Sequence, residues 1–121
     1  RILGSDNDPK CISLAMANAR KAGVAGLIEF RDGDATKMPL PTDSGIIVCN
    51  PPYGERLMDR SAAEQLYREF GIAMSKLPDT WRISVLSSHT EFERTFGHGE
   101  ARKRKLYNGM IKCDLFQYGK K

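Results

Sequence analysis

A short apolar run that stops at two prolines limits what this chain can fold into. Residues 45–50 are Gly-Ile-Ile-Val-Cys-Asn, and Pro51 and Pro52 follow directly. A continuous run of β-branched residues is typical of a strand that is covered on both faces, as strands of parallel sheets are. Each proline fixes its own φ, so the chain leaves the strand through a stiff turn. The run therefore predicts a buried strand of an α/β sheet.

Further strands are expected on either side of this run. Short apolar or alternating stretches predict strands at residues 1–5, 27–31 and 81–87, and a loop at residues 32–45. Helices are expected between these strands. Strands that alternate with helices imply a parallel sheet with right-handed crossovers.

The helices are predicted from capping residues and apolar spacing. Asn7 or Asp8 can cap the first helix, and Gly23 can end it. The residues at 61–64, Ser-Ala-Ala-Glu, form a capping box for the second helix, and those at 90–93, Thr-Glu-Phe-Glu, form one for a short third helix. The second helix should end at Pro78 and bury an apolar face made of Leu66, Phe70, Ala73, Met74 and Leu77.

The chain closes with a predicted antiparallel hairpin. Residues 102–107 and 110–118 flank Asn108-Gly109, a strong sequence signal for a two-residue turn. The first of these strands begins with Arg102, Lys103, Arg104 and Lys105. Such a run suits contact with phosphates, and it equally suits a solvated strand edge.

Composition narrows the class of protein. The chain has 121 residues, a formal net charge of +4 and 40% hydrophobic residues, with no run long enough for a membrane span. Its cysteines lack metal-ligand spacing, so we expect buried free thiols in a reducing cytoplasm and no metal site. The two histidines are expected on the surface or in loops. These residues are Cys11, Cys49, Cys113, His89 and His98.

Two acidic segments follow predicted strands, where α/β sheets bind ligands. Asp6 could accept hydrogen bonds from the two ribose hydroxyls of a nucleoside cofactor, and Asn7 could line the adenine. After the next strand, Asp34 could accept from the adenine amino group while the Ala35 N–H reaches a ring nitrogen. The alternatives are that Asp6 and Asp8 only cap a helix and that Asp-Gly-Asp is an ordinary turn.

Asn50-Pro51-Pro52-Tyr53 carries the chemistry that we expect. An exocyclic amine on a base is a poor nucleophile because its lone pair is delocalised into the ring. The Asn50 side-chain oxygen and the Pro51 carbonyl can each accept one N–H, which orients the nitrogen and stabilises its developing positive charge. Pro52 stiffens the turn, and Tyr53 can stack on a flipped base. The alternative is a rigid strand exit without chemistry.

These features resemble the Rossmann-like amino-methyltransferases, whose Asn/Asp-Pro-Pro-aromatic motif occurs in enzymes for adenine N6, cytosine N4, guanine N2 and glutamine N5. The sequence Asn-Pro-Pro-Tyr-Gly-Glu-Arg-Leu at 50–57 is similar to bacterial large-subunit ribosomal RNA guanine-N2 methyltransferases of the THUMP-associated UPF0020 type. The hairpin at 102–118 is similar to the closing hairpin of the same family. The resemblance implies S-adenosylmethionine as cofactor, ribosomal RNA as partner, and cofactor contacts from Asp6, Asn7, Asp34, Ala35 and Asn50.

The same comparison predicts that residues 1–121 are part of a methyltransferase domain. In the family, a glycine-rich loop after the first strand holds the methionine part of the cofactor, and no such loop occurs here. The family sheet order is 3-2-1-4-5-7-6. We therefore expect a Rossmann-like domain truncated before its central first strand, without a THUMP domain, and with weak or no cofactor binding on its own.

Three choices stay open. The substrate could be adenine N6 of DNA or RNA instead of guanine N2, or the chain could be a non-catalytic RNA-binding module with a vestigial cofactor site. Arg56 could contact RNA or could pair with Glu55. Asn108 could approach the target base, or it could simply form the turn.

Overall fold

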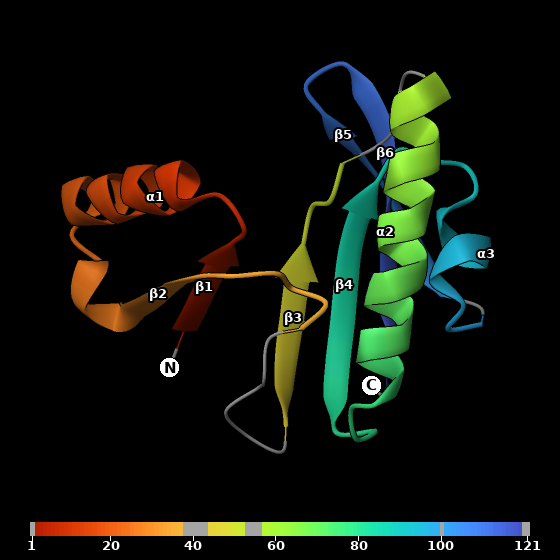
Figure 1. The fold of residues 1–121 in the computed structure, drawn as a ribbon, viewed down its shortest axis with the longest axis horizontal. Coiled ribbons are helices and arrows are strands. Elements are labelled where there is room, and N and C mark those ends of the chain that lie inside the picture. The colour runs from red at the N-terminus through yellow and green to blue at the C-terminus, as the bar shows by residue number, and fades with distance from the viewer. Residues whose placement is uncertain (1, 38–43, 53–56, 100, 120–121) are drawn as a thin grey trace. The chain divides into compact units, whose positions relative to one another are not determined.

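A computed structural model of the chain describes residues 2–37, 44–52, 57–99 and 101–119 (Figure 1). It divides into two compact units, Arg1–Pro39 and Leu40–Lys121, and each is described here by itself. The described strands form one sheet in each unit.

The first unit is a strand, a helix and a second strand. Its elements are β1 (Ile2–Asp6), α1 (Pro9–Ala22), the short 3-10 helix η1 (Ala25–Leu27) and β2 (Ile28–Asp32). The strands are parallel, with Ile2 opposite Ile28 and Asp6 opposite Asp32. The predicted caps of α1 are confirmed, because the Asp8 side chain accepts from the Lys10 N–H at 2.9 Å and Gly23 takes a left-handed conformation with φ 76°.

The second unit is a four-stranded sheet with helices on one face. Its elements are β3 (Gly45–Cys49), α2 (Leu57–Ser75), β4 (Trp81–Ser87), α3 (Phe92–Phe96), β5 (Arg102–Asn108) and β6 (Ile111–Tyr118). The strand order is β3-β4-β6-β5; β3 runs parallel to β4, and β6 runs antiparallel to β4 and β5. Together, the orders β1-β2 and β3-β4-β6-β5 confirm the family order for strands 2-3 and 4-5-7-6.

The core of the second unit lies between the sheet and α2 with α3 (Figure 1). Tyr67 is fully buried although it was not expected on the apolar face of α2, and the predicted Leu66 is only half-buried. The buried cluster consists of Ala63, Tyr67, Phe70, Met74, Ile83, Val85, Phe92, Phe96, Phe116 and Tyr118.

Strand β3 is covered on one face only, among the residues that the structure describes. Ile47 and Cys49 pack against the core cluster, whereas Ile46 and Val48 are 60% and 73% exposed. The prediction of a strand buried on both faces is therefore confirmed for one face and wrong for the other in this chain.

Both predicted capping boxes are wrong. Helix α2 begins at Leu57, so Ser61 lies inside it, and Glu64 points to His89 instead of back to a helix end. Helix α3 has Glu91 at its N-cap without a side-chain cap, and the Glu93 carboxylate accepts from the Ala101 N–H at 2.7 Å. In both cases the sequence has the Ser/Thr-x-x-Glu spacing, but the glutamate side chain contacts a residue outside its own helix instead of the backbone at the start of that helix.

The hairpin is confirmed, with its turn one residue later than predicted. Asn108 pairs with Ile111, so Gly109 and Met110 form the turn. Gly109 has φ 63°, and no residue other than glycine has a positive φ in the described chain. This is the pattern of a type II′ turn, which places glycine first, and it leaves Asn108 in β5.

Of the three cysteines, Cys113 is buried and Cys49 is half-buried, but Cys11 is exposed, contrary to the prediction of three buried thiols. The described residues contain no group of three potential metal ligands. None of the described helices combines the length and the apolar character that crossing a membrane requires.

Candidate active site

In the first unit, the predicted cofactor residues gather at the ends of the two strands. Asp6 ends β1, and its carbonyl accepts from the Gly33 N–H at 2.9 Å, so the turn after β2 lies beside it. The Asp6 carboxylate accepts from the Asp8 N–H at 2.9 Å. Asp8 is therefore the helix cap, and Asp6 and Asn7 are exposed at the edge where the parallel strands end.

Asp34 begins the turn that follows β2. One of its carboxylate oxygens accepts from the Thr36 hydroxyl at 2.6 Å and from the Thr36 N–H at 2.8 Å, and these bonds lower the pKa of Asp34. The alternative that Asp-Gly-Asp only forms an ordinary turn is thus correct for the one Asp34 oxygen that Thr36 holds. Within the described part of the chain, its second oxygen and the Ala35 N–H make no hydrogen bond, and both residues are exposed.

In the second unit, the Asn-Pro-Pro segment (residues 50–52) follows β3 directly. Asn50 is exposed and Pro51 is half-buried. The described residues provide no hydrogen bond to the Asn50 side chain or the Pro51 carbonyl, so both can accept from a ligand. Burial raises the pKa of the neighbouring Cys49 to about 11, so its thiol is neutral at pH 7 and adds no charge here.

Helix α2 holds the end of the Asn-Pro-Pro segment. The Tyr67 hydroxyl donates to the Pro52 carbonyl, and the Tyr67 ring lies 4.8 Å from that of Phe92 in an edge-on contact. Tyr67 is completely buried, so the carbonyl is tied to the core of the unit. The sequence contained only a weak signal for this role, namely an aromatic residue one position away from the predicted apolar face.

A buried contact between a histidine and a carboxylate lies just after β4. The His89 Nε2 is 2.8 Å from a carboxylate oxygen of Glu64, and the His89 side chain is 2% exposed. The His89 N–H donates to the Ser87 hydroxyl at 3.1 Å, and the Tyr67 and His89 ring centroids are 5.5 Å apart. The expected loop position is confirmed for His89, which lies between β4 and α3, but the residue is buried because Glu64 provides it with a polar partner.

These residues share the carboxyl edge, the edge of the second sheet at which β3 and β4 end. Because Cys49 lies opposite Val85, Asn50 comes level with Leu86, next to the segment that leads to His89. Tyr53 and Arg56, which were predicted to stack on the target base and to contact RNA, lie outside the described residues.

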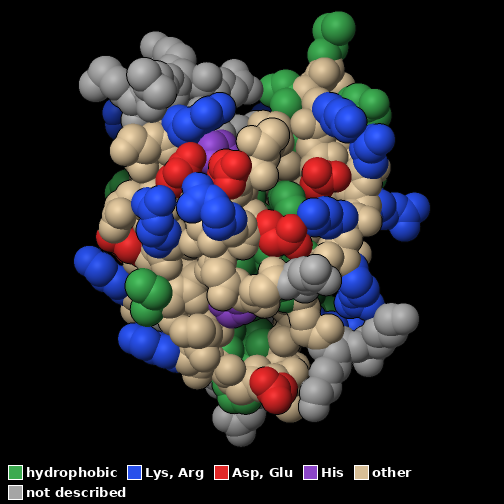
Figure 2. Space-filling view, turned by 90° about the vertical axis from the view of Figure 1, so that its right-hand side faces the viewer, with side chains coloured by type: hydrophobic (Ala, Val, Ile, Leu, Met, Phe, Trp, Pro, Cys, Tyr) green, Lys and Arg blue, Asp and Glu red, His purple; other side chains and the backbone are tan. Residues whose placement is uncertain are grey.

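The predicted RNA-binding run forms β5, and the structure divides it between two faces. Arg102 and Arg104 alternate with Lys103 and Lys105 along an exposed strand. The Lys103 Nζ lies 2.9 Å from the Glu93 carboxylate. The hydrogen bond from the Ala101 N–H to that carboxylate lowers the pKa of Glu93, and Lys103 lowers it further. Figure 2 shows Lys and Arg side chains along its right-hand margin, on the hairpin side of the molecule, with acidic side chains among them.

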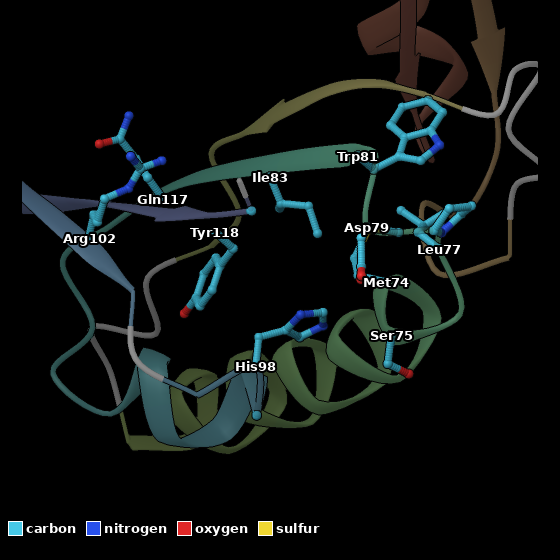
Figure 3. Close-up of a pocket in the computed structure, with 13 residues that line it drawn as sticks. Met74, Ser75, Leu77, Asp79, Trp81, Ile83, His98, Arg102, Gln117 and Tyr118 are labelled. Carbon is cyan, nitrogen blue, oxygen red and sulfur yellow. The ribbon is translucent and has the colours of Figure 1, made fainter. Parts of the chain in front are cut away.

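A cavity of about 730 Å³ lies at the opposite edge of the sheet, beside the first residue of β4 (Figure 3). Trp81, Ile83, Tyr118 and His98 surround it. Of the predicted site residues that the structure describes, Arg102 alone lines it. The cavity is therefore separate from the carboxyl edge.

Comparison with known proteins gives consistent matches over nearly the whole chain. A family model described as UPF0020, RMKL-like, methyltransferase domain, matches residues 1–117. The chain is 42% identical over 120 residues to "Putative RNA methyltransferase YpsC" of Bacillus subtilis strain 168, covering 99% of this chain and 31% of that protein. It is 35% identical over 116 residues to a ribosomal RNA large subunit methyltransferase K/L of Legionella pneumophila, covering 96% of this chain and 16% of that protein.

A solved structure matches the fold closely. The chain superposes with a TM-score of 0.90 and 38% identity on SMU.472, described as a putative methyltransferase complexed with SAH. The match covers 99% of this chain and 32% of that one. The chain thus spans about a third of that structure and a third or less of the two relatives.

Proposed function

Because the chain belongs to the RMKL-like methyltransferase domain family, we propose that it is part of an enzyme that methylates the exocyclic N2 of a guanine in ribosomal RNA. The fold is that of Rossmann-like methyltransferases. We further propose S-adenosylmethionine as the methyl donor and the cytoplasm as its location. SAH, bound in the similar solved structure, is the product that this donor leaves after methyl transfer.

The observation that carries the proposal is a pair of acceptors at the carboxyl edge. Among the described residues, none hydrogen-bonds the Asn50 side chain or the Pro51 carbonyl, and the Pro52 carbonyl is held by Tyr67. In the proposed reaction, the two acceptors each take one N–H of the guanine amino group. Its lone pair would then point out of the plane of the base, toward a bound methyl donor. Tyr53 stacks on the flipped base.

The chemical step is a direct displacement. If bound, S-adenosylmethionine would supply a methyl group on a sulfonium, whose carbon–sulfur bond would break as the amino nitrogen bonds the carbon, leaving SAH. The Asn50 and Pro51 oxygens would stabilise the positive charge that develops on the amino nitrogen. The extra proton leaves to water afterwards, so no strong base is required in the protein.

For the cofactor, we propose contacts in each unit by itself. In the first unit, Asp6 accepts from the ribose hydroxyls and Asn7 lines the adenine. The exposed second oxygen of Asp34 accepts from the adenine amino group, and the Ala35 N–H donates to the ring. In the second unit, Asn50 is the proposed cofactor contact. In this proposal, the bond from Thr36 orients Asp34 without using both of its oxygens.

The substrate is proposed from the names of the relatives and from charge. The Legionella protein is named for ribosomal RNA of the large subunit, and the Bacillus protein for RNA. Arg56 and the β5 cations Arg102, Lys103, Arg104 and Lys105 are the proposed RNA contacts. Adenine N6 of DNA or RNA is the alternative substrate. A non-catalytic RNA-binding module is the alternative function.

The test is methyl transfer by the full-length protein that carries this chain. Tritiated S-adenosylmethionine and undermodified ribosomal RNA should give labelled N2-methylguanosine on nucleoside analysis. Asn50→Ala should lower transfer at least ~100-fold and leave RNA affinity unchanged, because it removes an acceptor for the amino group. Labelled N6-methyladenosine would overturn the guanine assignment. Absence of cofactor binding in calorimetry would leave the non-catalytic alternative.

A further inference from the structure

We infer that the tip of the β5–β6 hairpin docks an unpaired RNA nucleotide beside the target base. Tyr107 would supply the stacking ring, and Lys105 and Lys112 would contact the adjoining phosphates. This inference rests on the proposed function and deepens it, because it locates the RNA contact on one part of the predicted basic strand.

The hairpin extends past the carboxyl edge. Ser87, the last residue of β4, lies opposite Asp114, and Asp114 lies opposite Lys105. At about 3.3 Å per residue, Tyr107 therefore reaches ~7 Å beyond the end of β4, whereas Arg102 lies ~10 Å behind it. Figure 1 shows the hairpin turn at the same end of the unit as the arrowheads of β3 and β4.

Strand alternation places the three proposed contacts on one face. Lys105 and Tyr107 are two residues apart in β5, and Lys112 is the cross-strand partner of Tyr107. Tyr107 is 66% exposed, and both lysines are exposed. Asp114, opposite Lys105, forms no ion pair with it among the described residues. The result is an exposed aromatic ring with two exposed lysines on the same face of the hairpin.

The tip also exposes apolar surface that is unusual for a turn. Met110 is 98% exposed, and Leu106 and Ile111 are 37% and 38% exposed. Hydrophobic side chains project at the upper right of Figure 2, where the hairpin lies. Strand alternation places Leu106 and Ile111 on the face of the hairpin opposite to Tyr107, so the proposed RNA contact rests on the ring and its lysines. A ring flanked by cations fits unpaired RNA, because bases stack on aromatic faces and phosphates attract lysine.

The distance between Tyr107 and the Asn-Pro-Pro segment decides which nucleotide the hairpin binds. Strands β4 and β6 separate β5 from β3, so Tyr107 and Asn50 are displaced sideways by about 14 Å at ~4.8 Å per strand. A base held at Asn50 cannot also stack on Tyr107. The hairpin thus takes a neighbouring nucleotide. Lys103 is a weaker candidate for RNA, because Glu93 already balances its charge.

The experiment measures RNA affinity of the full-length protein by fluorescence anisotropy, with an undermodified ribosomal RNA fragment as the probe. Tyr107→Ala should raise Kd roughly 5- to 150-fold, the range that corresponds to the loss of one stacked base. Tyr107→Phe should keep the wild-type Kd, and Tyr107→Leu should behave like Tyr107→Ala, because leucine keeps apolar area without a π-face. Equal affinity of Tyr107→Leu and the wild type would overturn the stacking role.

Salt dependence separates the lysines from the ring. Lys105→Gln and Lys112→Gln should each reduce the slope of log K against log salt by ~0.7 to 1, whereas Tyr107→Ala should leave it unchanged. Lys76→Gln and Ile72→Ala are matched controls, because the first removes an exposed charge just after α2 and the second removes an exposed apolar side chain on α2. Both should bind RNA like the wild type. Unchanged slopes for both lysine variants would contradict the phosphate contacts.

Methyl transfer distinguishes this inference from the proposed function. If Asn50→Ala abolishes transfer but Tyr107→Ala leaves Kd unchanged, the proposed function stands and the hairpin inference fails. If the wild type binds RNA through Tyr107 but transfers no methyl group, the hairpin inference stands and the catalytic proposal fails. A Tyr107-dependent dimer in gel filtration with no effect on RNA binding would assign the tip to self-association and overturn the inference.

Discussion

At the scale of single residues, Tyr67 connects the proposed catalytic segment to the core. Tyr67→Phe keeps the buried ring and removes the hydroxyl that holds the Pro52 carbonyl. We expect methyl transfer to fall about 10- to 100-fold, because a small displacement of the acceptors misaligns the amino group. Stability should fall by only ~0.5 to 1.5 kcal/mol, since Pro52 is exposed and water can replace the hydroxyl.

The measurement is kcat and KM of the full-length Tyr67→Phe enzyme, with its Tm as a check on folding. Ser75→Ala is the matched control, because it removes another α2 hydroxyl that donates to a backbone carbonyl, that of Ile72, away from the site. A loss of kcat in both variants would indicate a general effect on α2. Wild-type kcat in Tyr67→Phe would rule out the positioning role.

Single residues were predictable from the sequence where their chemistry is local. Asn50, Pro51 and Pro52 were recognised because they end an apolar run, and Asp8 and Gly23 because helix ends require them. Tyr67 and His89 were not recognised, because each contacts a residue distant in sequence: Pro52, 15 positions away, and Glu64, 25 positions away. Such pairs depend on how α2 packs on the sheet. The structure places the exit of β3 at Asn50, as predicted, but all proposed functional roles stay predictions, namely those of Asp6, Asn7, Asp34, Ala35, Asn50, Pro51 and Pro52.

At the scale of elements, the contact between α2 and α3 depends on a glycine. A β-carbon at Gly71 would lie 1.9 Å from the Phe96 carbonyl oxygen. Alanine is normally favoured over glycine within a helix by about 1 kcal/mol, but here it has to push α3 away. We expect Gly71→Ala to lower the free energy of unfolding by about 1 to 3 kcal/mol, measured by urea denaturation.

Gly26→Ala is the matched control for this prediction. A β-carbon there meets no atom within 4 Å, and Gly26 has no positive φ. That variant should be neutral or slightly more stable. A Gly71→Ala protein as stable as the wild type would mean that α3 moves freely on α2. In that case the Gly71 carbonyl should also lose its contact with His98, now 2.9 Å from the His98 Nε2.

Elements were easier to predict than their ends. All six strands and three α-helices were expected, since apolar spacing determines them. The starts of α2 and α3 were misplaced because a Ser/Thr-x-x-Glu spacing also occurs inside helices, where nothing distinguishes it locally. The hairpin turn was predicted one residue too early. Gly109 can be the second residue of an Asn-Gly turn or the first residue of a Gly-Met turn, and the sequence alone does not distinguish the two.

At the scale of the whole molecule, the exposed face of β3 gives a direct test of the prediction that this strand is covered on both faces. Ile46 and Val48 are exposed in this chain, which spans 31% of the Bacillus relative. Their sequence is typical of a strand covered on both faces. In the full-length protein, Ile46→Ser and Val48→Ser should each cost about 1 to 3 kcal/mol of stability, because buried apolar area would be lost.

Ile72→Ser on α2 is the comparison, since Ile72 is 61% exposed, much like Ile46. It should change stability by at most ~0.5 kcal/mol, as surface substitutions usually do. Chemical denaturation of the full-length variants measures all three. Equal, small effects would show that this face of β3 stays open in the complete protein.

The position of β6 has a consequence for how the chain folds as it is synthesised. Strand β6 is the last strand in the sequence, yet it lies between β4 and β5. On a ribosome, β4 therefore waits with an unpaired edge until residues 111–118 have emerged, and β5 has no strand to join before then. In a nascent chain stopped before residue 111, one edge of β4 and the residues of β5 would lack the partner that β6 provides. Unpaired strand edges of this kind favour aggregation.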